Sequence, residues 1–153
     1  MPGTVISIFT AAASGEPTIA HQNVRAVAGR GLEGDRYFES NAGDHDPEDE
    51  ITLIAAEGIG RAKTEHGVEL EPGEHRRNVV VEGVDLSAYV GEKIRVGAVE
   101  VEVIKPNPPC RYLTDLTGKP MLAVLRGAGG VRGRILTDGT IRVGDQVEPL
   151  STS

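Results

Sequence analysis

The sequence of 153 residues contains one cysteine and no tryptophan, and aromatic residues make up only 3% of it. A single cysteine excludes an internal disulfide and a cysteine-rich zinc site within one chain. The sequence also lacks an apolar run of about 18 residues, and its N-terminus has neither the basic region nor the long apolar region of a secretory signal. We therefore expect no membrane association and a reducing, cytoplasmic setting.

Positive charge is also scarce. Sixteen Lys and Arg residues face 23 Asp and Glu residues, which gives a formal net charge of −7 and a pI near 5.1. Such a surface repels phosphate backbones at long range, so we expect no nucleic-acid partner. A local basic pocket would have to come from clustered arginines.

Turn-forming residues are abundant, with 20 glycines and nine prolines. This composition favours many short elements, as in a barrel or sandwich, over a bundle of long helices. Hydrophobic periodicity predicts strands at residues 5–10, 21–28, 51–54, 78–81, 94–103, 131–137, 141–143 and 146–149, and helices at residues 55–66, 111–116 and 120–126. The prediction is one mostly-β domain over residues 1–150, a β-barrel with a few short helices, followed by a frayed tail at residues 151–153.

A four-residue sequence occurs twice, as residues 94–97 and 141–144, each time Ile-Arg-Val-Gly followed by a Val-Glu pair. Glycine adopts the positive φ that a tight turn requires. We interpret the echo as the same strand–Gly–strand connection used twice, and not as a duplicated domain.

Two other sequence patterns do not by themselves indicate a binding site. Residues 29–34 match Gly-x-Gly-x-x-Gly, but they do not open a helix within a βαβ unit, so we reject a dinucleotide site. Residues 39–50 are acidic and read as an exposed, solvated loop that lacks calcium-loop spacing. Whether that loop binds a cation stays open.

Cys110 follows two prolines and precedes Arg111 and a predicted short helix. A free cysteine is usually a small buried hydrophobe. Here, however, the unpaired N–H groups at a helix start and the adjacent Arg111 would favour a thiolate. Loops at strand ends of a rigid barrel are also common places for chemistry. The pattern suits a nucleophilic, persulfide-forming or metal-ligating thiol without choosing among them.

Arginines gather at Arg76-Arg77-Asn78 and in the glycine-rich residues 126–134, which include Arg132. Glycines allow backbone N–H groups to approach an anion, and arginine can hold a phosphate through two parallel hydrogen bonds. Because successive strand residues point to opposite faces, only one of Arg76 and Arg77 is expected to enter a given pocket. Together the clusters make a small anionic ligand plausible, with solvated surface arginines as the alternative.

Four blocks of the sequence resemble the MOSC family, which takes its name from the C-terminal domain of molybdenum-cofactor sulfurase. They are Gly-Leu-Glu-Gly-Asp-Arg-Tyr at residues 31–37, the segment from Pro72-Gly73 to residues 76–86, residues 90–97, and Pro-Pro-Cys at residues 108–110. The tail from Gly129 to Asp145 also resembles the smaller bacterial members. The match spans nearly the whole chain, and the order of the blocks is more specific than any one of them.

The resemblance implies a MOSC-type β-barrel in which Cys110 occupies the family's cysteine position, as a catalytic residue or a metal ligand. It implies the molybdenum cofactor, a pterin dithiolene that carries a phosphate, or a persulfide on Cys110. By analogy, the residues expected on the cofactor side are Arg77, Asn78, Arg111, Arg132, Arg36 and Asp35. No lysine motif for pyridoxal phosphate is present, and the chain lacks the added modules of larger members. A cysteine desulfurase or a redox partner is therefore expected.

Three functions stay open at this point. The chain could bind the molybdenum cofactor, and would then be a partner-dependent oxidoreductase if it is an enzyme. It could carry sulfur on Cys110 as a sulfur transferase does. It could also be a non-catalytic barrel that binds a small anion or a protein, because a fold resemblance does not by itself deliver an activity.

Overall fold

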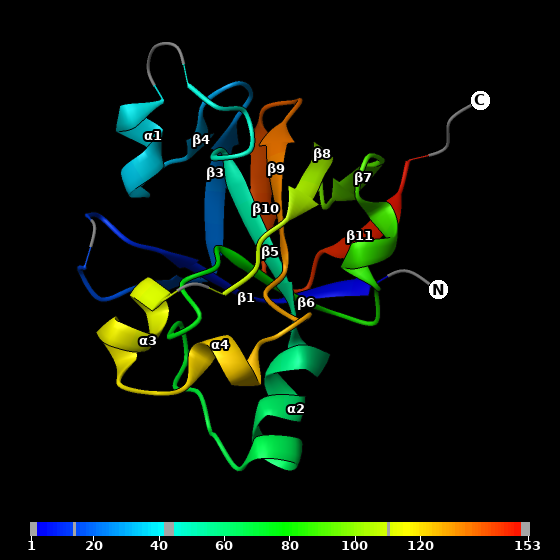
Figure 1. Cartoon of the computed structure of the whole chain (residues 1–153). Helices are drawn as coiled ribbons and strands as arrows, with labels where there is room; N and C mark the ends of the chain where they lie inside the picture. Colours follow the sequence, from blue (N-terminus) through cyan, green and yellow to red (C-terminus); the bar gives the residue numbers. More distant parts are fainter. Residues whose placement is uncertain (1–2, 14, 42–44, 110, 151–153) are drawn as a thin grey trace.

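The computed structural model describes residues 3–13, 15–41, 45–109 and 111–150, without the side chains of residues 39, 40, 111 and 112. Seven strands close into a barrel, because β1 pairs with both β6 and β11. In order around the barrel, these strands are β1 (Gly3–Thr10), β11 (Gln146–Pro149), β7 (Lys93–Val96), β8 (Val99–Pro106), β9 (Val131–Ile135), β5 (Ile51–Ala55) and β6 (Val79–Glu82) (Figure 1). The predicted mostly-β barrel with short helices is confirmed.

Four further strands complete the β structure. β2 (Ile19–His21) pairs with β1, while β3 (Asn23–Val27), β4 (Gly31–Leu32) and β10 (Gly139–Arg142) form a small second sheet. The strand predicted over residues 21–28 corresponds to β3, except that His21 is the last residue of β2 in the other sheet. Within β3, Val24 and Ala26 are buried and alternate with exposed residues.

The barrel interior is filled with aliphatic side chains, as the composition requires. Along β8, Val99, Val101 and Val103 are fully buried and alternate with partly exposed residues. This is the period-two alternation that predicted a half-buried strand. The predicted 94–103 strand is in fact a hairpin, in which Gly97 (φ 61°) joins β7 to β8.

In the second copy of the repeated Ile-Arg-Val-Gly sequence, the glycine connects strands of different sheets. Gly144 has a φ of 98°, so the predicted positive φ is confirmed at both glycines. However, β10 before Gly144 pairs with β3, and β11 after it pairs with β1 and β7. The first copy is a hairpin, and the second carries the chain from the small sheet into the barrel.

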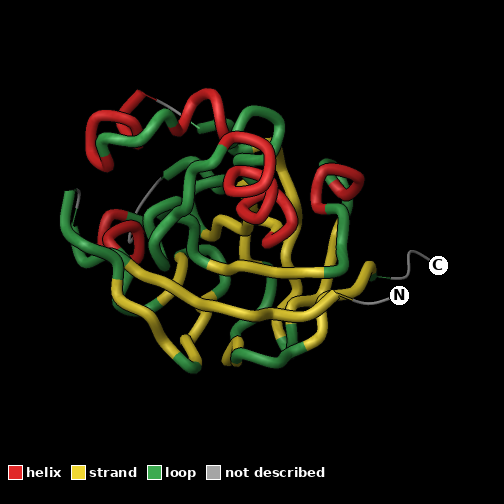
Figure 2. Tube along the Cα trace, turned by 90° about the horizontal axis from the view of Figure 1, so that it is seen from below, coloured by secondary structure: helices red, strands yellow, loops and turns green. Residues whose placement is uncertain are grey.

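Three helices cover one end of the barrel (Figure 1). α2 (Ala56–His66) ends at Gly67 (φ 67°), the predicted stop, and it links the parallel strands β5 and β6, which need a crossover. α3 (Arg111–Thr117) and α4 (Met121–Val124) pack with α2 around Leu113 and Met121. Most of the helical segments lie on one side of the strands (Figure 2). Among the described residues, no helix combines the length and apolar character needed to cross a bilayer.

The expectation of a wholly exposed acidic loop at residues 39–50 is wrong at its ends. α1 (Arg36–Ser40) reaches into it, and Asn41 and Glu50 are buried. Glu50 accepts hydrogen bonds from the Ile135 amide (2.9 Å) and is 2.8 Å from His45 Nε2, and Asn41 donates to the Arg30 carbonyl (2.8 Å). These buried polar groups keep their hydrogen bonds inside the protein, so the loop is anchored at both ends.

Candidate functional site

Most of the residues predicted for the site line one cleft, which has a volume of about 140 Å³. It lies where the end of β1, the start of α1, the residues before β6, the residues after β8 and the start of β9 meet. Its charged lining residues are Arg36, Arg76, Arg77, Arg132, Asp35 and Asp49. Four guanidinium groups thus face two carboxyl groups. This is a local positive excess in a chain whose net charge is −7.

Arg77 is buried in this cleft and joins three separate segments. Its guanidinium donates from Nε to the Gly129 carbonyl (2.8 Å), from Nη1 to the His75 carbonyl (3.1 Å), and from Nη2 to the carbonyls of Asn107 (2.8 Å) and Pro108 (3.2 Å). An arginine has five N–H donors, so these bonds engage most of them. The geometry makes Arg77 a positioning residue, which holds the segment leading into Cys110 against the glycine-rich strand start.

Gly129 permits this close approach. A Cβ at this position would lie 2.3 Å from the Asn107 carbonyl oxygen and 2.9 Å from Pro109. The backbone at residue 129 therefore packs directly on the segment that precedes Cys110. A glycine is needed here because of a close approach, and a positive φ is not involved.

Asn78 and Asp35 connect the strands that frame the cleft. Asn78 Oδ1 accepts from the amide and the hydroxyl of Thr52 (both 3.0 Å), and its Nδ2 donates to the Phe9 carbonyl (3.1 Å). Asp35 accepts from the Ala11 amide (3.0 Å). Burial raises the pKa of the Asp35 carboxyl, against the opposing effect of its backbone hydrogen bonds.

Two further predicted residues, Arg132 and Arg36, also line the cleft. Arg132 donates from Nε to Asn107 Oδ1 (2.8 Å) and from Nη1 to Asp49 Oδ1 (3.0 Å), and its side chain is one-third exposed. Arg36 donates to the Tyr37 hydroxyl (3.1 Å) and lies over that ring. Burial raises the pKa of Asp49, and the charge of Arg132 opposes this effect.

Arg76 is not among the residues predicted for the site, although it lines the same cleft. Its φ is 59°, and it is the one non-glycine residue with positive φ in the described part of the chain. Its Nη1 donates to the Glu16 carbonyl (2.6 Å), whereas Nη2 is buried without a hydrogen-bond partner among the described residues. The left-handed backbone breaks the strand alternation before β6, so the expectation that only one of Arg76 and Arg77 enters a pocket is wrong.

His75 supports this turn as a neutral side chain. It is buried, its Nδ1 accepts from the Arg77 amide (2.9 Å), and Phe9 packs against its ring edge. Burial, followed by the nearby charge of Arg77, lowers the pKa of His75 to about 4. Since Nδ1 is the acceptor, the proton of the neutral ring is on Nε2.

Cys110 lies outside the described residues, and so does the side chain of Arg111. The backbone of Arg111 begins α3, as predicted, and Pro108 lines the cleft. No three His, Cys, Asp or Glu residues gather into a metal-binding group within the described ranges. In the acidic loop, Asp49 instead pairs with Arg132, and Glu48 pairs with Lys105 (2.6 Å).

The fold and this cleft define the class of protein. The MOSC domain family matches residues 39–148, more than half of the chain, and the protein therefore belongs to the MOSC domain family. The structure is similar to that of the YuaD protein from Bacillus subtilis, with a TM-score of 0.82 and 18% sequence identity over 100% of this chain and 98% of that one.

Other solved structures share the fold. YiiM from Geobacillus stearothermophilus has a TM-score of 0.72 and 16% identity over 98% of this chain and 76% of its own. YiiM from Escherichia coli has a TM-score of 0.71 and 19% identity over 100% and 71%. No significant match was found among curated protein sequences.

Proposed function

We propose that this MOSC protein binds the molybdenum cofactor at the arginine-lined cleft, with the thiol of Cys110 as a ligand of the metal. The cofactor is a pterin dithiolene that bears a phosphate, and when bound it supplies a redox-active metal. A thiolate is a suitable ligand for such a metal, and arginine is suited to the phosphate.

The observation that carries this proposal is the gathering of four arginines around one cleft of an acidic chain. One of them, Arg76, has a buried Nη2 without an acceptor among the described residues. A buried donor without an acceptor costs about 1–3 kcal/mol. Arg76 also holds an unfavourable backbone conformation, and such strain is concentrated at functional sites. Arg76 thus combines two unfavourable features at a position that lines the cleft, which supports a functional role for this residue.

The size of the cleft limits how much of the ligand it can hold. Its volume of about 140 Å³ is below the roughly 300–1,000 Å³ of pockets for larger small molecules. It therefore suits the phosphate end, bound by Arg76, Arg132 and Arg36. Pro108 also lines a neighbouring hollow with Pro109 and Leu122, which leaves room for the rest of the ligand beside the Cys110 segment.

Arg77 acts by position in this scheme. Its bonds to Asn107 and Pro108 hold the carbonyls three and two residues before Cys110. Two residues span at most about 7 Å, so the point where Cys110 is attached stays close to the cleft. A neighbouring positive field also favours the thiolate over the thiol. Any electrons or sulfur would come from a redox partner or a cysteine desulfurase.

Metal analysis tests the proposal directly. Wild-type protein and Cys110→Ser are produced in cofactor-replete cells, and molybdenum per chain is measured. The wild type is expected to hold about one molybdenum and the variant to lose it. Arg95→Gln, a change at an exposed residue on β7 outside the cleft, serves as the matched control and should keep its molybdenum.

Wild-type protein without molybdenum under these conditions contradicts cofactor binding. Incubation with a desulfurase and cysteine then distinguishes the other two functions. A gain of about 32 Da, one sulfur, at Cys110 identifies a persulfide carrier. No gain leaves a non-catalytic barrel that binds an anion or a protein.

A further inference from the structure

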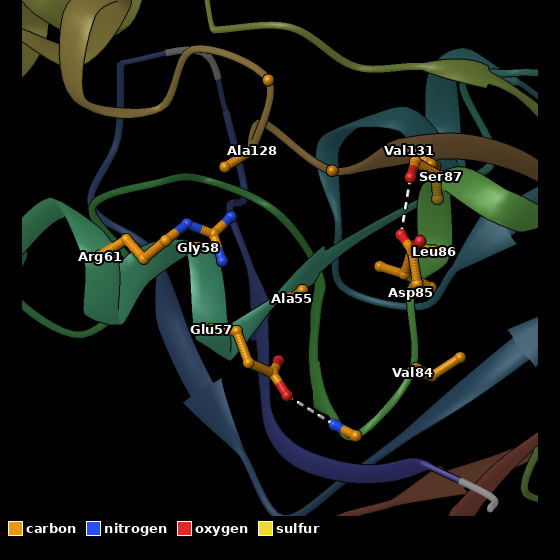
Figure 3. A pocket seen from close by; sticks show the side chains of 13 residues that line it. Ala55, Glu57, Gly58, Arg61, Val84, Asp85, Leu86, Ser87, Ala128 and Val131 are labelled. Atoms are coloured by element: carbon orange, nitrogen blue, oxygen red, sulfur yellow. Dashed lines mark hydrogen bonds between the residues drawn. The ribbon is translucent and has the colours of Figure 1, made fainter.

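A second cavity of about 340 Å³ lies behind the glycine-rich segment and shares no lining residue with the arginine cleft. It is formed by the first two turns of α2, the turn after β6 and residues 127–131 (Figure 3). Gly129 separates the two spaces, because its carbonyl accepts from Arg77 while its neighbours Ala128 and Gly130 line the second cavity. Its volume is within the range of small-molecule sites.

Arg61 supplies the positive charge of this cavity. It is exposed, and no hydrogen bond or ion pair of its side chain occurs among the described residues. Glu57 stands four residues earlier on α2, a spacing at which Glu and Arg normally pair. Instead, Glu57 Oε2 accepts from the Gly83 amide (2.8 Å), which draws that carboxylate to the far wall. The guanidinium of Arg61 is thereby left available to a carboxylate from solution.

The opposite charge is placed across the cavity. Asp85 accepts from the Ser87 hydroxyl (2.6 Å) through Oδ1, and its second oxygen has no partner in the described part of the protein. Glu57 likewise uses one oxygen for Gly83. Figure 3 shows Arg61 on one side and Asp85 on the other, with Glu57 between them. Two carboxylates with open acceptor positions suit an ammonium group.

The wall between these charges is apolar. Ala55, Val84, Ala128 and Val131 line it. Gly58 lets the loop approach α2, since a Cβ there would lie 2.7 Å from that of Ala128. The cavity therefore combines an apolar wall with one cationic and two anionic groups.

From this arrangement we infer that the cavity between α2 and the glycine-rich segment is a binding site for a small apolar α-amino acid. Arg61 binds the carboxylate, Glu57 and Asp85 accept from the ammonium group, and the side chain contacts the apolar wall. A simple carboxylate would be repelled by the two acidic residues, and a simple amine by Arg61. A ligand with both charges satisfies all three residues.

The test is a titration of the full chain followed by backbone amide NMR, with L-leucine as the probe. Two analogues each lack one charge: 4-methylpentanoate has no ammonium group, and 3-methylbutylamine has no carboxylate. Leucine is expected to give saturable shifts at Gly83 and Ser87, with dissociation constants at least about fivefold weaker for both analogues, as loss of one charged hydrogen bond implies. Absence of saturable shifts with leucine, or equal affinity for all three, overturns the inference.

Variants locate the site. Arg61→Ala should weaken leucine binding by about threefold to tenfold, given that the pair is partly screened by solvent. Lys63→Ala, on the same helix but outside the cavity, should not change it. Ser87→Trp should block the cavity, whereas Ala88→Trp, its exposed neighbour, should not. Equal effects of the members of either pair contradict the assignment.

Discussion

Replacing Arg77 with glutamine removes four hydrogen bonds that converge on one buried guanidinium. The acceptors are backbone carbonyls, and three of these bonds, to Gly129, His75 and Asn107, are buried. Each lost bond that leaves a buried carbonyl unsatisfied costs about 1 kcal/mol, so the three together cost about 3 kcal/mol. The bond to Pro108 is only part-buried, and water can replace it. In a chain of this size the melting temperature should fall by about 6–12 °C.

Urea unfolding and thermal scans measure this change. Arg95→Gln is the matched control, because Arg95 is exposed on β7 and should change the free energy of unfolding by less than about 0.5 kcal/mol. Arg77→Lys should fall between the two, since one ammonium group cannot reproduce the planar set of donors. If Arg77→Gln is as stable as Arg95→Gln, then the guanidinium does not hold these segments and the reasoning fails.

Three further predictions concern the stability of the folded chain. The pKa of His75 is lowered to about 4 from 6.5, so the unfolded chain takes the proton first. The stability due to the neutral ring is therefore complete above about pH 6.5, and about 3 kcal/mol of it is lost as the pH falls toward 4. When the free energy of unfolding is measured at several pH values, His75→Gln should lose less stability over this range than the wild type. Parallel curves for the two proteins would refute this. Gly129→Ala should destabilise by about 1–3 kcal/mol, because its Cβ would lie 2.3 Å from the Asn107 carbonyl oxygen. Gly60→Ala, on α2 with open space around it, should instead stabilise by about 0.5–1 kcal/mol, and a loss of stability in urea unfolding would contradict the packing described for α2.

The barrel could be predicted from local patterns because they act over short distances. Alternation over residues 99–103 placed three valines in the core, and Gly67 ended α2 where expected. The predictions failed where distant partners decide the structure. Glu50 is buried because the Ile135 amide and His45 satisfy its carboxylate, and nothing in the acidic sequence 39–50 indicates those partners.

The candidate site shows the same division. Residue type and order were enough to select Arg77, Asn78 and Arg132, which all line one cleft. They did not predict what Arg77 does there, because the carbonyls that it binds lie 30 and 52 residues away in the sequence. Arg76 was missed because its left-handed backbone breaks the strand alternation on which the prediction relied. Nothing in the sequence indicates that a non-glycine residue just before a strand adopts a positive φ.

The central claim is that the arginine-lined cleft holds the anionic end of a cofactor beside Cys110. Pterin content, measured by fluorescence after oxidative release, tests it for wild-type, Arg76→Met and Arg95→Met proteins from cofactor-replete cells. Loss of a charge-assisted hydrogen bond in a cleft should lower retained pterin about tenfold in Arg76→Met, and Arg95→Met should match the wild type. Equal pterin in all three proteins, or none in the wild type, would contradict the account.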